Sequence, residues 1–228
     1  MRGKIYRRLD RLYARAERIP DANLYKFLFF SDLHMGGGGK ADDFAPNFNL
    51  FIKVLDEHKG WIDVCVGDAY DLWQFKLIDV AKTHDVGAAD FYVEGNHDKQ
   101  MRFPAADVIE ADPPIFIIHG HQSGDWSNYG LWKVSRFFVR YIWKPLEYLN
   151  LKDPPSSKGG VRHDRSRRKL KRWANDRGIR VIAGHTHFQE HEGNYWNCGS
   201  SINPGVIEYI EFKEGELCLK TYSQPTTS

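Results

Sequence analysis

The stretch DFYVEGNHD, residues 90–98, passes from a short apolar run directly into a cluster of polar residues. Four other stretches have the same form and the β-branched or aromatic content of buried strands. They are YKFLFFSD (25–32), IDVCVGD (62–68), PIFIIHGH (114–121) and IRVIAGHTH (179–187). Residues 47–58, NFNLFIKVLDEH, place apolar side chains on one helical face. Because strands alternate with helical segments, the sequence predicts an α/β fold.

The polar residues that end these five runs are rich in metal-binding types and hold six of the ten histidines. In chain order they are Asp32-Leu33-His34, Gly67-Asp68-Ala69-Tyr70-Asp71, Gly95-Asn96-His97-Asp98, His119-Gly120-His121 and Gly184-His185-Thr186-His187. We expect them to converge, since the carboxyl ends of strands in an open α/β sheet gather ligands. Imidazole, carboxylate and amide oxygen together suit Mn, Fe, Zn or Co better than Ca or Cu. Alone, D-x-H and G-H-x-H are weak signals and G-N-H-D is moderately specific. All five motifs together predict donors for two metal ions, the clamp used for in-line displacement at phosphorus.

Length and composition exclude several classes of protein. A chain of 228 residues with 42% hydrophobic residues fits one large α/β domain. No stretch reaches about 18 uncharged apolar residues, which excludes a membrane-spanning helix. The first 20 residues lack the features of a signal peptide, and the three cysteines form no C-x-x-C pair. We therefore expect a reduced, cytoplasmic protein, with peripheral contact at the inner membrane surface left open.

Positive charge is concentrated in two segments. Residues 1–20 carry seven Lys or Arg against two acidic residues, and residues 158–180 carry ten against two. Since the net charge of the chain is only +2, the remainder is acidic. The basic segments predict either solvated helix faces or surfaces for phosphate, nucleic acid or an anionic membrane.

The first basic segment has helical periodicity. Residues 4–19 repeat apolar side chains every three or four positions, and Pro20 follows. We expect residues 1–20 to form a basic amphipathic helix that either docks on the remaining domain, 21–228, or lies on a membrane surface.

Residues 122–178 interrupt the alternation and predict a helical insertion. Its first helix, 131–149, combines a stripe of four cations with crowded aromatic side chains, and a Pro/Ser/Gly hinge at 153–160 separates it from a second, basic helix at about 165–176. Seven cations of the second part could bind phosphate or form a solvated face: Arg162, Arg165, Arg167, Arg168, Lys169, Lys171 and Arg172. Beyond the insertion, residues 206–222 predict a hairpin turned by Glu214 and Gly215.

The order D-x-H, G-D-x-x-D, G-N-H-D, H and G-H-x-H resembles the calcineurin-like metallophosphoesterases from about residue 25 to residue 212. The resemblance implies a four-layer α/β/β/α sandwich with a dinuclear metal centre and here a helical cap insertion. Asp32, His34 and His187 would hold one metal, Asn96, His119 and His185 the second, and Asp68 would bridge both. His97 would be the catalytic histidine and Asp71 the acid that orients it. Two divalent ions are expected, Mn first, with Fe, Zn, Co and Ni as alternatives.

Within that superfamily the chain is most similar to the UDP-2,3-diacylglucosamine hydrolases, through SDLH, GDxxDLW, HGH and GHTH. In that group the insertion caps the site and receives acyl chains, which implies a phosphorylated small-molecule or lipid substrate, such as a UDP-sugar lipid. The chain departs from the group at His97, where the group carries arginine, and at His121, where it carries aspartate. Two alternatives stay open: a phosphodiesterase or nuclease that uses the basic segments to bind nucleic acid, and a non-catalytic scaffold, which the complete ligand set disfavours.

Overall fold

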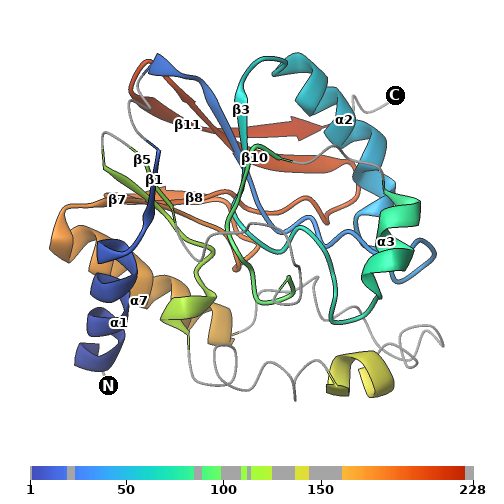
Figure 1. Ribbon diagram of the computed structural model, residues 1–228, viewed down its shortest axis with the longest axis horizontal. Coiled ribbons are helices and arrows are strands. Elements are labelled where there is room, and N and C mark those ends of the chain that lie inside the picture. Colours follow the sequence, from blue (N-terminus) through green and yellow to red (C-terminus); the bar gives the residue numbers. More distant parts are fainter. Residues whose placement is uncertain are drawn as a thin grey trace.

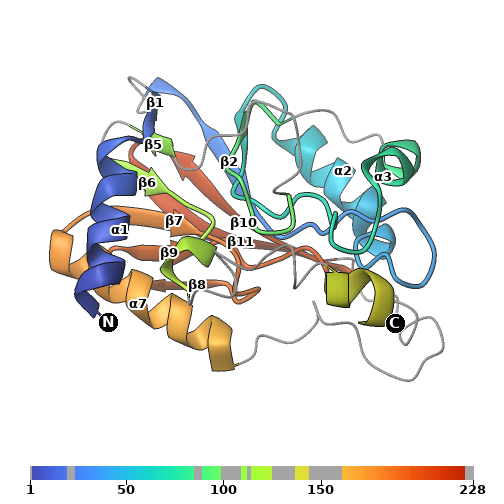
Figure 2. The ribbon, with the colours of Figure 1, turned by 60° about the horizontal axis from the view of Figure 1, so that its bottom comes forward.

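The structure is a computed structural model that describes residues 2–19, 24–84, 89–98, 109–111, 114–124, 137–143 and 161–223. Two β-sheets face each other, and helices cover the outer face of each (Figures 1 and 2). This arrangement is the predicted four-layer α/β/β/α sandwich.

The five-stranded sheet has the order β11-β10-β2-β3-β4. β2 (Phe27–Phe30), β3 (Ile62–Cys65) and β4 (Phe91–Tyr92) run parallel, and α2 (Phe48–Glu57), preceded by the short turn η2 (Ala45–Asn47), and α3 (Leu77–Thr83) lie along the chain between them. β10 (Val206–Lys213) and β11 (Glu216–Ser223) form the predicted hairpin. Its turn residues Glu214 and Gly215 have φ of 55° and 83°, the left-handed conformation of the favoured two-residue turn.

The six-stranded sheet has the order β1-β5-β6-β7-β9-β8. Its strands are β1 (Glu17–Ile19), β5 (Ile109–Ala111), β6 (Ile115–Ile117), β7 (Arg180–Ala183), β9 (Tyr195–Asn197) and β8 (Glu190–Glu192). α1 (Arg2–Ala14) and α7 (Val161–Arg177) pack side by side on its outer face (Figure 2). The short turn η3 (His121–Ser123) contacts both helices, and η4 (Val139–Trp143) is a π-helical turn.

Side chains alternate between the two faces of each strand, and this alternation explains how the layers pack together. In β2, Phe27 and Phe29 enter the core between the sheets, whereas Leu28 and Phe30 pack toward α2. On the opposite side, Phe116 of β6 packs against Trp173 of α7. β2 and β6 are thus buried on both faces, which is why the sequence shows short continuous apolar runs there.

The N-terminal helix is shorter than predicted. α1 ends at Ala14, and residues 17–19 form β1, which pairs in parallel with β5 and buries Ile19 between the sheets. The expectation of a helix through residue 19 was therefore wrong, because the periodic position of Ile19 also suits a strand. The apolar stripe of Ile5, Leu9 and Leu12 is buried in the cluster that contains Leu170 and Trp173. The helix thus docks on the domain, and this stripe is not available to a membrane.

The predicted insertion divides differently from the expectation. α7 begins at Val161 and buries Leu170, Trp173 and Ala174 against the six-stranded sheet, so it forms a layer of the sandwich rather than a cap. Of the expected helix 131–149, the structure describes 137–143, which is helical. The remainder of that helix and the 153–160 hinge lie outside the described residues. Among the helices described, none is long and apolar enough to cross a bilayer.

Candidate active site

All nine predicted site residues follow strands at the same end of the two sheets. Asp32 and His34 follow β2, and Asp68 and Asp71 follow β3. Asn96 and His97 follow β4, His119 follows β6, and His185 and His187 follow β7. Direct contacts link the loops: the amide of His97 donates to Asp68 at 2.8 Å, and the amide of His185 donates to Asp32 at 2.7 Å. Strands from both sheets therefore contribute to one site.

The backbone of this site is strained. Among the described residues, six non-glycine residues have positive φ, and five of them are predicted ligands: Asp32 (53°), His34 (49°), Asp68 (53°), His185 (70°) and His187 (54°). Such angles persist only where the surrounding structure enforces them, and they are common at functional sites.

Glycines permit the close approach of these loops. A Cβ at Gly95 would collide with Asp68, and a Cβ at Gly184 would collide with Ser31 and Asp32. Gly67, with φ of 94°, lies directly against the imidazole of His119. The sequence therefore requires glycine before these ligands for space as well as for turning.

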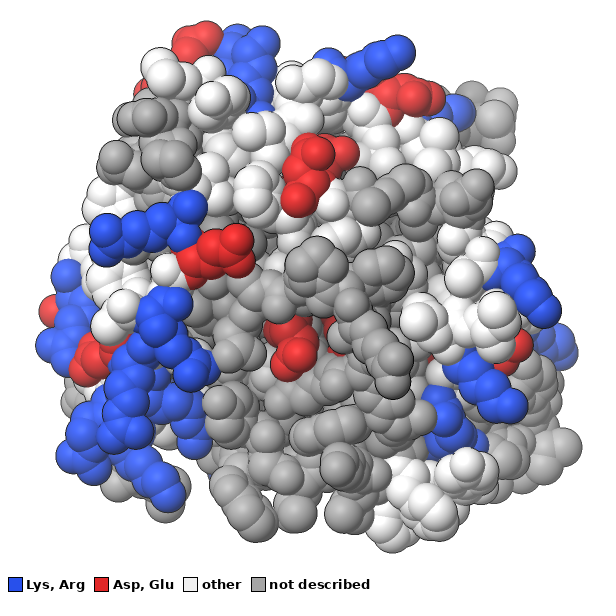
Figure 3. All heavy atoms as spheres, in the orientation of Figure 1, with Lys and Arg blue, Asp and Glu red and all other residues white. Residues whose placement is uncertain are grey.

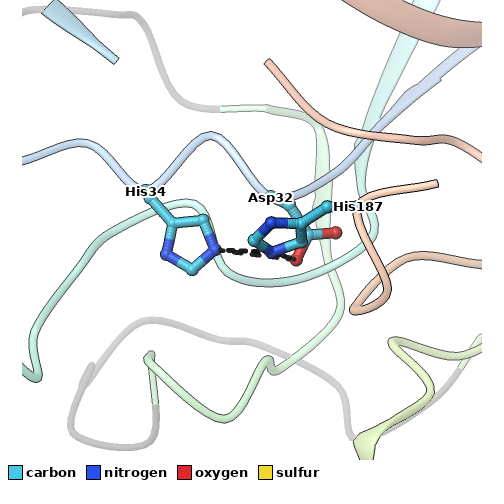
Figure 4. Close-up of side chains that lie close together, drawn as sticks. All are labelled: Asp32, His34 and His187. Carbon is cyan, nitrogen blue, oxygen red and sulfur yellow. Dashed lines mark hydrogen bonds and ion pairs between the residues drawn. The ribbon is translucent and has the colours of Figure 1, made fainter. Parts of the chain in front are cut away.

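Asp32, His34 and His187 form the first cluster of donors (Figure 4). The two Nε2 atoms of the histidines lie 3.1 Å apart, and Nε2 of His187 lies 3.2 Å from Oδ1 of Asp32. The other carboxylate oxygen of Asp32 accepts a hydrogen bond from Ser31 Oγ at 2.5 Å. Burial raises the pKa of Asp32, but the neighbouring His187 and His119 outweigh it, so the pKa lies well below its usual value. Asp32 is therefore a carboxylate.

Asp68, His119 and His185 form the second cluster, and all three are buried. Nδ1 of His119 donates to the carbonyl of Val66 at 2.8 Å, which leaves Nε2 as an acceptor that faces Oδ2 of Asp68 at 3.2 Å. Two acceptors at this distance require a cation or a proton between them. Burial lowers the pKa of His119, but Asp68 and Asp32 outweigh it and raise the pKa to about 9. The pocket thus stabilises positive charge.

Several buried side-chain atoms in the described part of the chain lack hydrogen-bond partners, and Oδ1 of Asn96 and Nε2 of His119 are among them. A buried polar atom without a partner costs about 1–3 kcal/mol. A divalent cation would satisfy both atoms, so the donor set fits the predicted metals. His121 is also buried, and its ring centroid lies 5.4 Å from that of His119. Of these two histidines, His119 is the one that belongs to the second donor cluster.

His97 and Asp71 form a hydrogen-bonded pair beside the clusters. Nδ1 of His97 lies 2.9 Å from Oδ1 of Asp71. Burial raises the pKa of Asp71, but the hydrogen bond to His97 outweighs it, and the pKa is lowered. Since the carboxylate accepts a proton from Nδ1, the other ring nitrogen is left for a ligand. The side chain of His97 is 17% exposed, so a substrate could reach it.

Two residues that contribute to the site were not predicted. Asp98 accepts hydrogen bonds from the amides of Ala69 and Tyr70, at 3.2 and 3.0 Å, and so holds the loop between Asp68 and Asp71. Burial and the charge of Asp68 raise the pKa of Asp98 to about 7. Trp73 stacks on His97, with ring centroids 4.2 Å apart. Both residues belong to the quoted motifs, GNHD and GDxxDLW, which were the available signal.

Comparison with known proteins identifies the family of this chain. The model of the calcineurin-like phosphoesterase family matches residues 25–189, which is most of the chain. The cold-active protein-tyrosine phosphatase of a psychrophile Shewanella sp. has 14% sequence identity and a TM-score of 0.44, over 91% of this chain and 82% of that one. A mutant cold-active protein tyrosine phosphatase has a TM-score of 0.43 at the same identity and coverage. No curated protein matches. Because the family model spans all five motifs up to the last histidine, this chain belongs to the calcineurin-like phosphoesterases, which are metal-dependent phosphoester hydrolases.

Proposed function

We propose that this chain hydrolyses a phosphoester or phosphoanhydride bond at a dinuclear metal centre. Seven side chains would hold the two ions: Asp32, His34, Asp68, Asn96, His119, His185 and His187. One observation carries the proposal. Oδ2 of Asp68 lies 3.9 Å from Nε2 of His34 and 3.2 Å from Nε2 of His119, so a single carboxylate oxygen stands between the two donor clusters. A bridging ligand needs this position.

The two ions, with Mn expected first, would neutralise phosphate charge and lower the pKa of an attacking water. The side chains and backbone of the chain would prepare the site for these two effects. Asp32 and Asp68 supply the negative charge that attracts cations, and Val66 fixes the tautomer of His119 through its carbonyl. Five of the seven proposed ligands have positive φ, a conformation that persists only where the surrounding structure enforces it, so the fold itself would hold them in place.

His97 would protonate or stabilise the oxygen that leaves phosphorus. Nδ1 of His97 lies 2.9 Å from Oδ1 of Asp71, whose carboxylate fixes the ring and leaves Nε2 for the leaving oxygen. Such a general acid typically contributes about 10²–10⁴-fold in rate. Asp71 acts through His97 and is a positioning residue.

For the substrate we favour a pyrophosphate with an apolar moiety, such as a UDP-sugar lipid. Four apolar side chains on the helical segment 137–143 are between 46% and 63% exposed: Phe137, Phe138, Tyr141 and Ile142. The same segment hydrogen-bonds through Arg140 to the turn that carries Trp73, next to His97. These side chains could therefore receive an apolar group near the reacting phosphate.

The basic residues of α7 support a nucleic-acid substrate less well. Lys and Arg side chains gather over α1 and α7 (Figure 3). However, Arg167 pairs with Asp164 at 2.7 Å, Lys171 pairs with Glu192 at 2.8 Å, and Arg168 pairs with Asp164 at 2.9 Å. Cations that are already paired within the chain bind phosphate less strongly.

A comparison of acylated and deacylated substrates tests the proposal. We would measure kcat/KM of the Mn-loaded protein for UDP-diacylglucosamine, its deacylated form, a nucleotide pyrophosphate, a cyclic nucleotide and single-stranded DNA. Each buried methylene contributes about 0.8 kcal/mol, so an apolar site should favour the acylated form by several orders of magnitude. Phe138→Asp should reduce that preference, with Leu24→Asp, another exposed apolar position, as the control. Equal values for the two forms would eliminate the lipid substrate, and no turnover of any phosphoester would contradict the proposed reaction.

A further inference from the structure

Trp73 contacts two residues of the proposed site at once. Its indole is 9% exposed and stacks on the imidazole of His97, with ring centroids 4.2 Å apart and planes 12° apart. Its Nε1 donates a hydrogen bond to the carbonyl of Asn96 at 2.8 Å. Asn96 and His97 are adjacent in the chain, so one side chain holds both a metal-binding residue and the histidine of the site.

The stacking restricts a motion that hydrogen bonding leaves free. His97 has a hydrogen bond from Nδ1 to Asp71 at 2.9 Å, and a ring held at one nitrogen can still swing about that bond. A flat aromatic surface against the imidazole fixes the plane of the ring and therefore the direction of Nε2. Orientation of this kind matters, because a displacement of about 1 Å can cost about 10²-fold in rate.

A distant residue holds the turn that carries Trp73. The turn follows Asp71, whose carbonyl accepts hydrogen bonds from the amides of Gln74 and Phe75 at 3.2 and 3.0 Å. Nη2 of Arg140 donates to the two carbonyls on either side of Trp73, that of Leu72 at 2.8 Å and that of Phe75 at 2.5 Å. Arg140 lies in the helical segment 137–143, which also bears the exposed apolar side chains.

We propose that Trp73 is a positioning residue for His97 and Asn96. Arg140 holds the turn that carries Trp73 by hydrogen bonds, and this contact couples segment 137–143 to the orientation of the His97 ring. This inference rests on the proposed function, in which His97 acts on the leaving oxygen. It extends that function by giving segment 137–143 an effect on the chemical step, separate from binding an apolar group.

Leaving-group dependence distinguishes positioning from packing. We would assay p-nitrophenyl phosphate, whose nitrophenolate leaves without protonation, and phenyl phosphate, whose leaving oxygen needs an acid. Trp73→Leu keeps apolar bulk but removes the aromatic face. We expect kcat to fall by about 10- to 100-fold for phenyl phosphate and only a few-fold for p-nitrophenyl phosphate, with KM unchanged. Arg140→Met, which keeps length but removes the donors, should show the same selectivity to a smaller extent.

Controls separate the inference from the proposed function. His97→Ala should show the selective loss in full, and Trp73→Leu added to it should cause little further loss, because both changes remove one effect. Trp61→Leu removes a tryptophan that contacts His58 at the opposite end of β3 and should change neither rate. If His97→Ala retains full activity on both esters, the proposed role of His97 fails. If His97→Ala loses activity selectively but Trp73→Leu lowers both rates equally, only the present inference fails.

Two measurements on the zinc-loaded protein do not depend on activity. The ring protons of His97 should carry a ring-current shift in the nuclear magnetic resonance spectrum that disappears in Trp73→Leu and shrinks in Arg140→Met. Trp73→Phe keeps an aromatic face but loses the donor to Asn96, so the shift should persist while calorimetry shows weaker binding of one metal ion. An unchanged shift in Arg140→Met would overturn the coupling, even if Trp73→Leu failed to fold.

Discussion

The carboxylate of Asp42 holds the glycine-rich loop that follows Asp32 and His34. It accepts hydrogen bonds from the amides of Gly36 at 3.1 Å, Gly38 at 2.8 Å and Ala45 at 3.1 Å. Nε2 of His84 lies 2.7 Å from its second oxygen. The carboxylate side chain is fully buried. Asp42→Ala would therefore leave three backbone donors and an imidazole without their acceptor, and we expect it to destabilise the fold by about 3–5 kcal/mol at pH 7.

This loss depends on pH in a defined direction. Burial raises the pKa of Asp42, but the hydrogen bonds from His84 and Gly38 outweigh it, so the folded-state pKa lies below the usual value. A carboxyl with a lowered folded-state pKa stabilises the fold above its unfolded-state pKa of about 3.9. That stability disappears as pH falls through the folded-state pKa. The difference between wild type and Asp42→Ala should therefore be largest at pH 5–8 and shrink below about pH 4.

Urea denaturation at pH 7, 5 and 3.5 measures the difference. Asp56→Ala is the matched control, since Asp56 is an exposed aspartate on α2, and its effect should stay within about 0.5 kcal/mol. A difference for Asp42→Ala below about 1 kcal/mol at pH 7, or one that does not shrink in acid, would refute this account of the loop.

Three further outcomes are expected. Leu9→Ala should lower the free energy of unfolding, measured by urea denaturation, by about 2–5 kcal/mol, because Leu9 is fully buried in the core with α7. Arg11→Ala, at an exposed position of the same helix, should lower it little, and equal effects would contradict docking of α1. Asp63→Asn should stabilise the fold by about 1 kcal/mol at pH 7, because burial and Asp90 raise the pKa of Asp63 to about 6. The gain in stability should vanish as pH falls toward 4, where the carboxyl of the folded protein is neutral. A gain that persists at pH 4 would exclude this cause. Chelation with EDTA should abolish turnover and lower Tm, and re-addition of Mn²⁺ should restore both; turnover that survives chelation would exclude a required metal.

Motifs at strand ends were the most predictable part of the molecule. The five apolar runs, the α2 helix and the 206–222 hairpin follow from local periodicity and turn chemistry, and the structure confirms them. The convergence of Asp32 and Asp68 also follows, since β2 and β3 are parallel neighbours that end at one edge. The approach of His185 does not follow from local pattern, because β7 lies in the other sheet. The metal-binding roles of these residues stay predictions.

Contacts between distant segments could not be predicted. β1 exists because Ile19 enters the core between the sheets and Glu17–Ile19 pairs with β5, about 90 residues later in the sequence. In the same way, Arg140 contacts the carbonyls of Leu72 and Phe75, and no local pattern marks that pairing. The sequence also did not show that α7 forms a layer of the sandwich. Its many basic residues dominate the sequence pattern, although Leu170 and Trp173 form a buried apolar face.

Metal content of the Asp68→Ala variant tests the dinuclear centre most directly. Asp68 lies between the two donor clusters, so its removal should loosen both ions while the other ligands stay in place. We would load wild type, Asp68→Ala and the exposed control Asp56→Ala with Mn²⁺, remove free metal and count bound ions by mass spectrometry, with circular dichroism to verify folding. The account predicts two ions per chain in wild type and control, and at most one, without turnover, in folded Asp68→Ala. Two ions retained by Asp68→Ala with normal turnover would contradict it.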